Sequence, residues 1–192
     1  MGNGAVIHLD LRGVFPLAVI GADNFGIILS QLLIYYQAVP IILTLSDENY
    51  KKAKESGIYY VLGKDDNWQK EVSTITGGRM AENVVYISDC NISSVKAFSL
   101  ASYKAHVVFT GATYNNTISF MQAIKKQLSI ICVNNGYGNT ASSINLLVTK
   151  AVKLDYLKID AISYNDVPET LQKLNSMIDE TGSTHEIMVE ML

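Results

Sequence analysis

The chain has few of the residues that build disulfide frameworks or metal centres. Its 192 residues include two cysteines and three histidines. Cys90 and Cys132 stand far apart in apolar surroundings, and we interpret them as small buried hydrophobic residues in a reducing compartment rather than as a disulfide or a metal pair. His8, His106 and His185 are too scattered to form a ligand set, so we expect them to have structural roles.

The sequence also lacks an excess of charge of one sign and long hydrophobic runs. It has 15 Lys and Arg against 18 Asp and Glu, a net charge of −3, and it has no basic stripe that could neutralise a run of phosphates. The apolar stretch 27–36 is interrupted by Ser30 and Gln31 and is shorter than the roughly 20 residues that cross a bilayer. The first residues lack the basic and then apolar pattern of a secretory signal. We therefore expect neither nucleic acid nor a membrane as a partner, and a cytoplasmic location.

Short apolar runs that alternate with amphipathic segments dominate the chain, and 48% of its 192 residues are hydrophobic. Alternation of this kind predicts repeated β-α units, and runs without polar alternation predict strands covered on both faces. The expected strands are 17–20, 41–45, 59–62, 83–88, 106–110 and 128–133. The expected helices between them are 25–37, 47–56, 67–76, 92–103 and 118–126.

These elements predict an α/β fold, a Rossmann-type doubly wound parallel six-stranded sheet with helices on both faces. After this core we expect C-terminal helices at 140–154 and 167–178 and a terminal strand at 186–191. The expected organisation is a short lead at 1–15, a dinucleotide-binding core at 16–139 and a C-terminal extension at 140–192.

The turn after the first expected strand carries the clearest functional signal. Gly21 and Gly26 occupy the first and last glycine positions of the G-x-G-x-x-G pattern, directly after an apolar strand and at the start of an apolar helix. The first glycine permits a tight turn, the last permits close packing of helix on sheet, and the helix N-terminus offers unpaired N–H groups to a pyrophosphate. The pattern predicts a dinucleotide-binding turn.

Asp23 replaces the middle glycine of this pattern. A carboxylate about 5 Å from a phosphate charge opposes it by roughly 3 kcal/mol at an effective dielectric of 20, and by under about 1 kcal/mol in water. The Asp23 side chain can also cap the helix and occupy N–H donors of Phe25 or Gly26. We expect cofactor binding to be weakened.

The acid that binds the adenosine ribose in many such domains, about 20 residues further on, has no direct counterpart. The chain has Thr44, Leu45 and Ser46 there, and Asp47 and Glu48 follow in the first turn of the next helix. Carboxylates in the first turn of a helix interact favourably with the helix dipole. We prefer this explanation of Asp47 and Glu48 to ribose recognition. No Arg or Lys stands in this stretch to hold a 2′-phosphate, so the choice between NAD and NADP stays open.

The order of these features resembles the nucleotide-binding half of the medium-chain, zinc-type alcohol and polyol dehydrogenases. The resemblance extends from about residue 17 to 192. Its motifs are Val19-Ile20-Gly21-Ala22 with Gly26, and the segments 53–61, 75–79, 107–111, 128–131 and 165–169.

The resemblance implies an oxidoreductase that moves a hydride between nicotinamide and an alcohol carbon, with zinc holding the alcohol oxygen in many members. The N-terminal catalytic domain of the family, with its zinc ligands, has no counterpart in residues 1–15. We therefore interpret the chain as an excised or truncated nucleotide-binding domain that holds no zinc and does not turn over alcohol alone. The resemblance also places a subunit-contact strand near residues 118–124, so we expect a homodimer formed through sheet-edge strands.

The expected cofactor surface combines the resemblance with the rule that ligands lie beyond the carboxyl ends of parallel strands. It comprises Gly21, Asp23, Asn24, Phe25 and Gly26 at the diphosphate, Thr44, Leu45 and Ser46 at the ribose, and Ser88, Asp89, Gly111, Ala112, Thr113, Asn134, Asn135 and Gly136 at later strand ends. Two alternatives remain: a non-catalytic dimerisation or nucleotide-sensing module that has lost tight dinucleotide binding, and a Rossmann-like domain for another adenosine ligand.

Overall fold

The computed structural model describes residues 16–87, 92–110, 120–133, 140–156, 159–173 and 186–190. The chain forms two compact units, Met1–Lys153 and Leu154–Leu192. The expected finer boundary at residue 139 stays a prediction.

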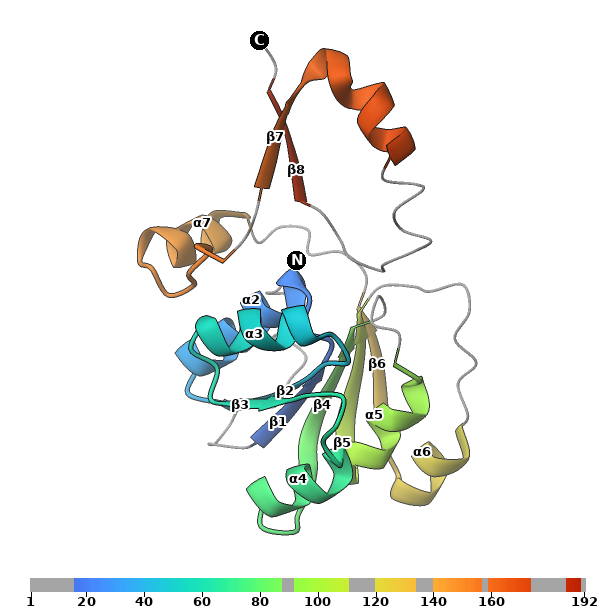
Figure 1. Ribbon diagram of the computed structural model, residues 1–192. Helices are drawn as coiled ribbons and strands as arrows, with labels where there is room; N and C mark the ends of the chain where they lie inside the picture. Colours follow the sequence, from blue (N-terminus) through green and yellow to red (C-terminus); the bar gives the residue numbers. More distant parts are fainter. Residues whose placement is uncertain are drawn as a thin grey trace. The chain divides into compact units, whose positions relative to one another are not determined.

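The first unit is built on a six-stranded, fully parallel sheet with the order β3-β2-β1-β4-β5-β6 (Figure 1). The sheet grows from β1 in both directions, so the order reverses between β1 and β4. This arrangement confirms the expected Rossmann-type α/β fold. The strands are β1 (Pro16–Ile20), β2 (Val39–Leu43), β3 (Tyr60–Leu62), β4 (Ala81–Ile87), β5 (Ala101–Thr110) and β6 (Ser129–Val133).

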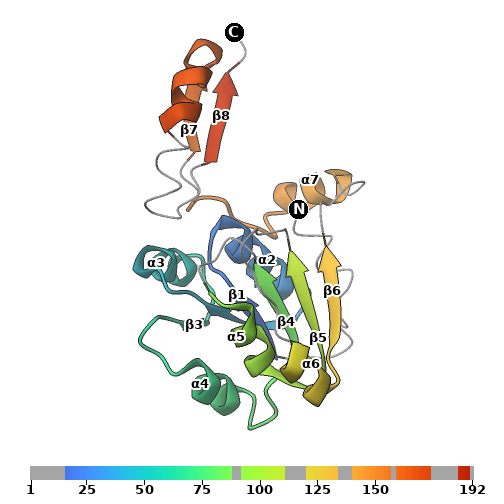
Figure 2. The same ribbon diagram turned by 90° about the vertical axis from the view of Figure 1, so that its right-hand side faces the viewer.

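Helices connect successive strands and cover the sheet. They are α2 (Asn24–Tyr35), α3 (Asp47–Glu55), α4 (Trp68–Ile75), α5 (Ser94–Leu100), α6 (Phe120–Lys126) and, after β6, α7 (Thr140–Val148). Because successive side chains of a strand point to opposite faces of the sheet, helices can pack on either face. One face packs on α4, α5 and α6 in a buried cluster that includes Ile20, Leu43, Tyr86, Phe98 and Trp68. Figure 2 shows α5 and α6 together beside β4, β5 and β6.

The side chain of Lys126 ties α6 to the end of α5. Its Nζ donates to the carbonyl oxygens of Phe98, Ser99 and Ala101 at 2.8, 3.1 and 2.7 Å. Burial lowers the pKa of this ammonium, while three carbonyl acceptors match its three N–H donors. The contact closes the C-terminal end of α5, where carbonyl groups have no partner within the helix.

The expected helix 92–103 is wrong at both ends. Here α5 begins at Ser94, after the Ser93 cap, and ends at Leu100, and the chain enters β5 directly at Ala101 with extended backbone angles. Ala101 already pairs with Ala81, and the register then shifts before His106 pairs with Asn83. Lys104 lies in this irregular stretch with a φ of 61°, which no right-handed helix accommodates.

Two further expectations need correction. Cys132 was expected to be buried but is exposed, because β6 is an edge strand of the sheet; Cys90 lies outside the described residues. The helix expected at 140–154 ends at Val148, where Lys150 adopts a φ of 55° and the N–H of Ala151 donates to Leu146 at 3.0 Å. A left-handed residue of this kind terminates a helix.

The second unit contains two parallel strands, β7 (Ile159–Ser163) and β8 (Glu186–Glu190). A 3-10 turn, η1 (Tyr164–Asp166), leads into a helix described over 167–173. The helix expected from residue 167 and the strand expected from 186 are both present, whereas β7 was not expected.

Candidate functional site

The turn between β1 and α2 has the geometry that its two glycines predict. Gly21 has a φ of 112°, which favours glycine, and its N–H donates to the Leu43 carbonyl at 2.9 Å. A Cβ at Gly26 would lie 2.1 Å from the Gly21 carbonyl oxygen and 2.9 Å from Cδ1 of Ile87. Only glycine therefore allows α2 to start this close to the end of β1.

Asp23 caps α2, as expected from the sequence. Its Oδ1 accepts the N–H of Gly26 at 2.8 Å, and its carbonyl accepts the N–H of Ile27 at 3.0 Å. The half-buried carboxylate thus occupies one donor of the helix N-terminus that a phosphate would use. Asn24 and Phe25 form the start of the helix beside it and are also half-buried.

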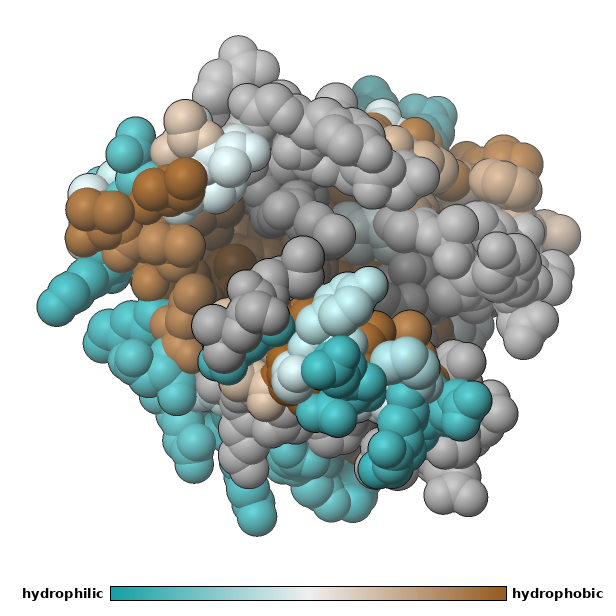
Figure 3. All heavy atoms as spheres, turned by 90° about the horizontal axis from the view of Figure 1, so that it is seen from above, coloured by the Kyte–Doolittle hydropathy of each residue, from teal (hydrophilic) through white to brown (hydrophobic). Residues whose placement is uncertain are grey.

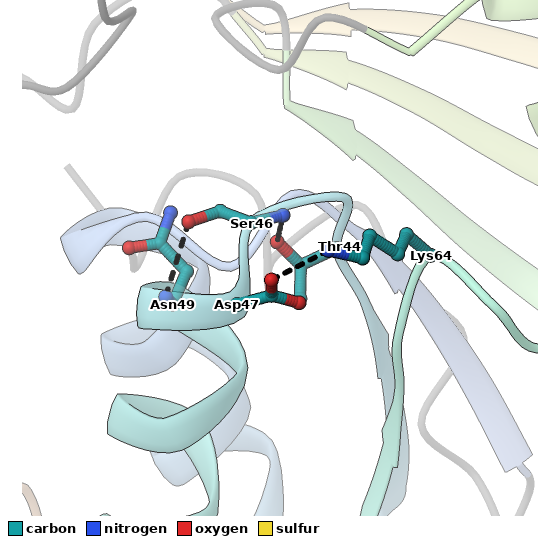
Figure 4. A network of polar contacts seen from close by, with 5 residues as sticks. All are labelled: Thr44, Ser46, Asp47, Asn49 and Lys64. Atoms are coloured by element: carbon teal, nitrogen blue, oxygen red, sulfur yellow. Dashed lines mark hydrogen bonds and ion pairs between the residues drawn. The ribbon is translucent and has the colours of Figure 1, made fainter.

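The end of β2 is organised by two hydroxyl groups. Oγ1 of the buried Thr44 accepts the N–H of Ser46 at 3.1 Å, and Oγ of Ser46 accepts the N–H of Asn49 at 3.3 Å (Figure 4). Ser46 is therefore the N-cap of α3. Leu45 lies between them with 47% of its surface exposed, so an apolar side chain faces solvent where the adenosine end of a dinucleotide is expected.

An ion pair that sequence reasoning missed lies beside these groups. Nζ of Lys64, in the loop after β3, is 2.5 Å from Oδ2 of Asp47 in the first turn of α3 (Figure 4). The hydrogen bond to Asp47 and the charge of that carboxylate raise the pKa of Lys64. Because β2 and β3 pair in parallel with Leu43 opposite Leu62, both strands end at the same edge of the sheet. The adjacency of these two strand ends was the signal that could have identified Lys64 as a site residue.

The remaining expected site residues lie outside the described residues: Ser88, Asp89, Gly111, Ala112, Thr113, Asn134, Asn135 and Gly136. The strands that lead to them end at the same edge as β1, since Ile20 pairs with Tyr86, Ile87 with Thr110, and Thr110 with Val133. The structure thus brings the first turn and the end of β2 to one edge, next to the point where the sheet order reverses.

The described residues contain no group of three or more His, Cys, Asp or Glu side chains arranged to hold a metal ion. In the same part of the chain, no helix is long and apolar enough to cross a membrane.

Comparison with known proteins places these features in context. No protein-family model matches the chain. An uncharacterised zinc-type alcohol dehydrogenase-like protein of Haemophilus influenzae is 26% identical over 174 residues, which are 89% of this chain and 51% of that protein. The chain therefore spans about half the length of the curated relative that it matches.

Solved structures share the fold at lower identity. A protein described as a short chain alcohol dehydrogenase, from Escherichia coli CFT073 and crystallised with the cofactor NADH, matches 99% of this chain and 56% of its own, with a TM-score of 0.79 and 19% identity. The 2R,3R-butanediol dehydrogenase from Bacillus subtilis matches 100% of this chain and 55% of its own, with the same TM-score of 0.79 and 19% identity. The chain thus has the Rossmann-type fold of alcohol dehydrogenases and resembles zinc-type alcohol dehydrogenase-like proteins over about half their length, which confirms the resemblance seen in its motifs.

Proposed function

We propose that this chain is the nucleotide-binding half of a medium-chain, alcohol or polyol dehydrogenase-like oxidoreductase and binds NAD or NADP at the carboxyl edge of its sheet. The observation that carries the proposal is the β1–α2 turn, in which Gly21 and Gly26 bring a helix N-terminus against the strand end at the point where the sheet order reverses. The NADH in the E. coli structure of the same fold supports this assignment.

The described residues fit such a ligand in two places. The pyrophosphate would lie at the start of α2, where Asn24, Phe25 and Gly26 follow the Asp23 cap, and the adenosine ribose beside Thr44, Leu45 and Ser46. A bound nicotinamide supplies the hydride-accepting or hydride-donating carbon. The later expected residues, from Ser88 to Gly136, complete the proposed surface.

Turnover is not part of the proposed activity of this chain alone. The resemblance assigns the zinc ligands and the substrate pocket to a catalytic domain that the matched half does not include. We propose that the isolated chain binds cofactor but does not oxidise alcohol, that it needs no zinc, and that it works in the cytoplasm without a nucleic acid or membrane partner.

Titration calorimetry with NADH and NADPH tests the binding, with ADP-ribose as a competitor that lacks the nicotinamide. We expect saturable heat at high micromolar to millimolar cofactor and displacement by ADP-ribose. Absence of heat from both cofactors at millimolar concentration would contradict the proposal. It would favour the alternative, a non-catalytic dimerisation or sensing module in which Asp23 has replaced the phosphate.

A homodimer is the partner that the sheet edge supports. β6 ends the sheet order, and the preceding α6 exposes 55% of Phe120, 63% of Met121 and 73% of Ile124. Exposed edge strands pair readily with a second copy. Light scattering at tens of micromolar should give twice the mass of the chain, and Ile124→Glu should shift it to the monomer; a monomeric parent chain would contradict the dimer.

A further inference from the structure

The Asp47–Lys64 ion pair lies where the ribose of the proposed cofactor would bind. Asp47 directly follows Ser46, which closes the end of β2 and caps α3. Both charged side chains are open to solvent, with 71% of Asp47 and 47% of Lys64 exposed. A ligand can therefore reach either member of the pair.

The backbone around Lys64 is held in place by its own loop. The N–H of Gly63 donates to Oδ2 of Asp66 at 2.7 Å, and the indole Nε1 of Trp68 donates to the Gly63 carbonyl at 2.6 Å. The N–H of Thr44 donates to Leu62 at 3.0 Å, which ties the same loop to the end of β2. Lys64 thus projects from a fixed position beside the first turn of α3.

The two members of the pair favour different cofactors. A carboxylate accepts hydrogen bonds from ribose hydroxyls and repels a phosphate, whereas an ammonium binds the 2′-phosphate that distinguishes NADP from NAD. Ser46, the N-cap of α3, carries no charge that would oppose either ligand. Glu48, the next acid, is paired with Lys52 at 2.9 Å on the same helix.

We infer that Asp47 and Lys64 together set the choice between NAD(H) and NADP(H), and that the intact pair accepts both. The inference rests on the proposed dinucleotide binding. In the intact pair the attraction of Lys64 for a 2′-phosphate is offset by the repulsion of Asp47. When one member of the pair is substituted, the charge of the remaining member decides which cofactor binds more tightly.

Two substitutions with opposite expected effects test this inference, with the full chain titrated by NADH and NADPH in low salt. The wild-type dissociation constants should agree within about tenfold, since the exposed charges offset each other. Asp47→Asn should shift the affinity ratio about three- to tenfold toward NADPH, and Lys64→Met should shift it by about as much toward NADH. Raising the salt to 1 M should reduce both shifts, because the Debye length falls to about 3 Å.

Charge-matched controls separate the local effect from net charge. Glu55→Gln removes an acid at the far end of α3, and Lys125→Met removes an exposed lysine from α6. Neither should change the ratio more than about twofold if local charge decides the preference. Shifts of Asp47→Asn and Lys64→Met in the same direction, or no larger than those of the controls, would overturn the inference while cofactor binding stands. Failure of both cofactors to bind would overturn the proposed function, and this inference with it.

Discussion

Substitution of Asp23 tests whether the cap of α2 weakens cofactor binding. Its Oδ1 lies 2.8 Å from the N–H of Gly26, so a phosphate at the helix N-terminus would compete for this donor and face the carboxylate charge. At about 5 Å the repulsion is roughly 3 kcal/mol for an effective dielectric of 20 and under about 1 kcal/mol in water. Asp23 is half-buried, so we expect an intermediate value, about 1.4 kcal/mol or more. Asp23→Gly should therefore bind NADH at least about tenfold more tightly.

The fold should tolerate this change. Glycine at a helix N-cap costs only a few tenths of a kcal/mol relative to Asp. Asp23 has a φ of −68°, in a region open to every residue, so the substitution relieves no strain and introduces none. Urea denaturation should show a stability change below about 1 kcal/mol, which separates affinity from folding.

Asp23→Asn distinguishes the two ways in which the carboxylate can act. Asparagine keeps an oxygen that accepts the Gly26 N–H but carries no charge. If charge repulsion dominates, Asn and Gly should tighten NADH binding equally in calorimetric titrations. Tightening by Gly alone would mean that the occupied donor is the cause. Unchanged affinity in both variants would refute the electrostatic reasoning and place Asp23 away from the phosphate.

Two further predictions concern stability, measured by urea denaturation. Gly26→Ala should cost about 3 kcal/mol or more, because its Cβ would meet a backbone oxygen at 2.1 Å; the control Gly57→Ala, with a φ of 89° and open space around it, should cost only about 1–2 kcal/mol. Lys126→Met should cost about 2 kcal/mol, because three carbonyl groups lose a charged donor. The neighbouring exposed Lys125→Met should change stability by less than about 0.5 kcal/mol, and equal costs for the two lysines would show that the carbonyl contacts contribute nothing.

Much of the fold could be predicted because the strands β1, β2 and β4 are buried on both faces. All six expected strands overlap those of the sheet. Short continuous apolar runs between turn residues are typical of parallel strands that are covered on both faces. The boundary between α5 and β5 was misplaced because no Gly or Pro separates Leu100 from Ala101. The local sequence pattern cannot locate the boundary where a helix passes directly into a strand. Here the pairing of Ala101 with Ala81 sets that boundary.

The site was predictable where it depends on contacts within a few residues. Gly21, Asp23 and Gly26 act on one another across a single turn, so their spacing alone indicated both the close approach and the cap. The Asp47–Lys64 contact joins residues 17 positions apart. It depends on the register of β2 with β3, which residue spacing does not show.

Both ends of the proposed cofactor site hold a carboxylate that already has a partner, Asp23 with the Gly26 N–H and Asp47 with Lys64. A bound ligand therefore replaces existing contacts with new ones instead of pairing with unoccupied hydrogen-bond donors. The net binding free energy is only the difference between the two sets of contacts. The exchange differs at the two ends. At Asp23 the competing anion is a half-buried side chain that caps α2, whereas Asp47 and Lys64 are exposed side chains free to change rotamer. Selectivity at the ribose and affinity at the diphosphate can consequently both change with little loss of stability, because Asp47 and Lys64 are exposed and glycine at the Asp23 cap position costs only a few tenths of a kcal/mol.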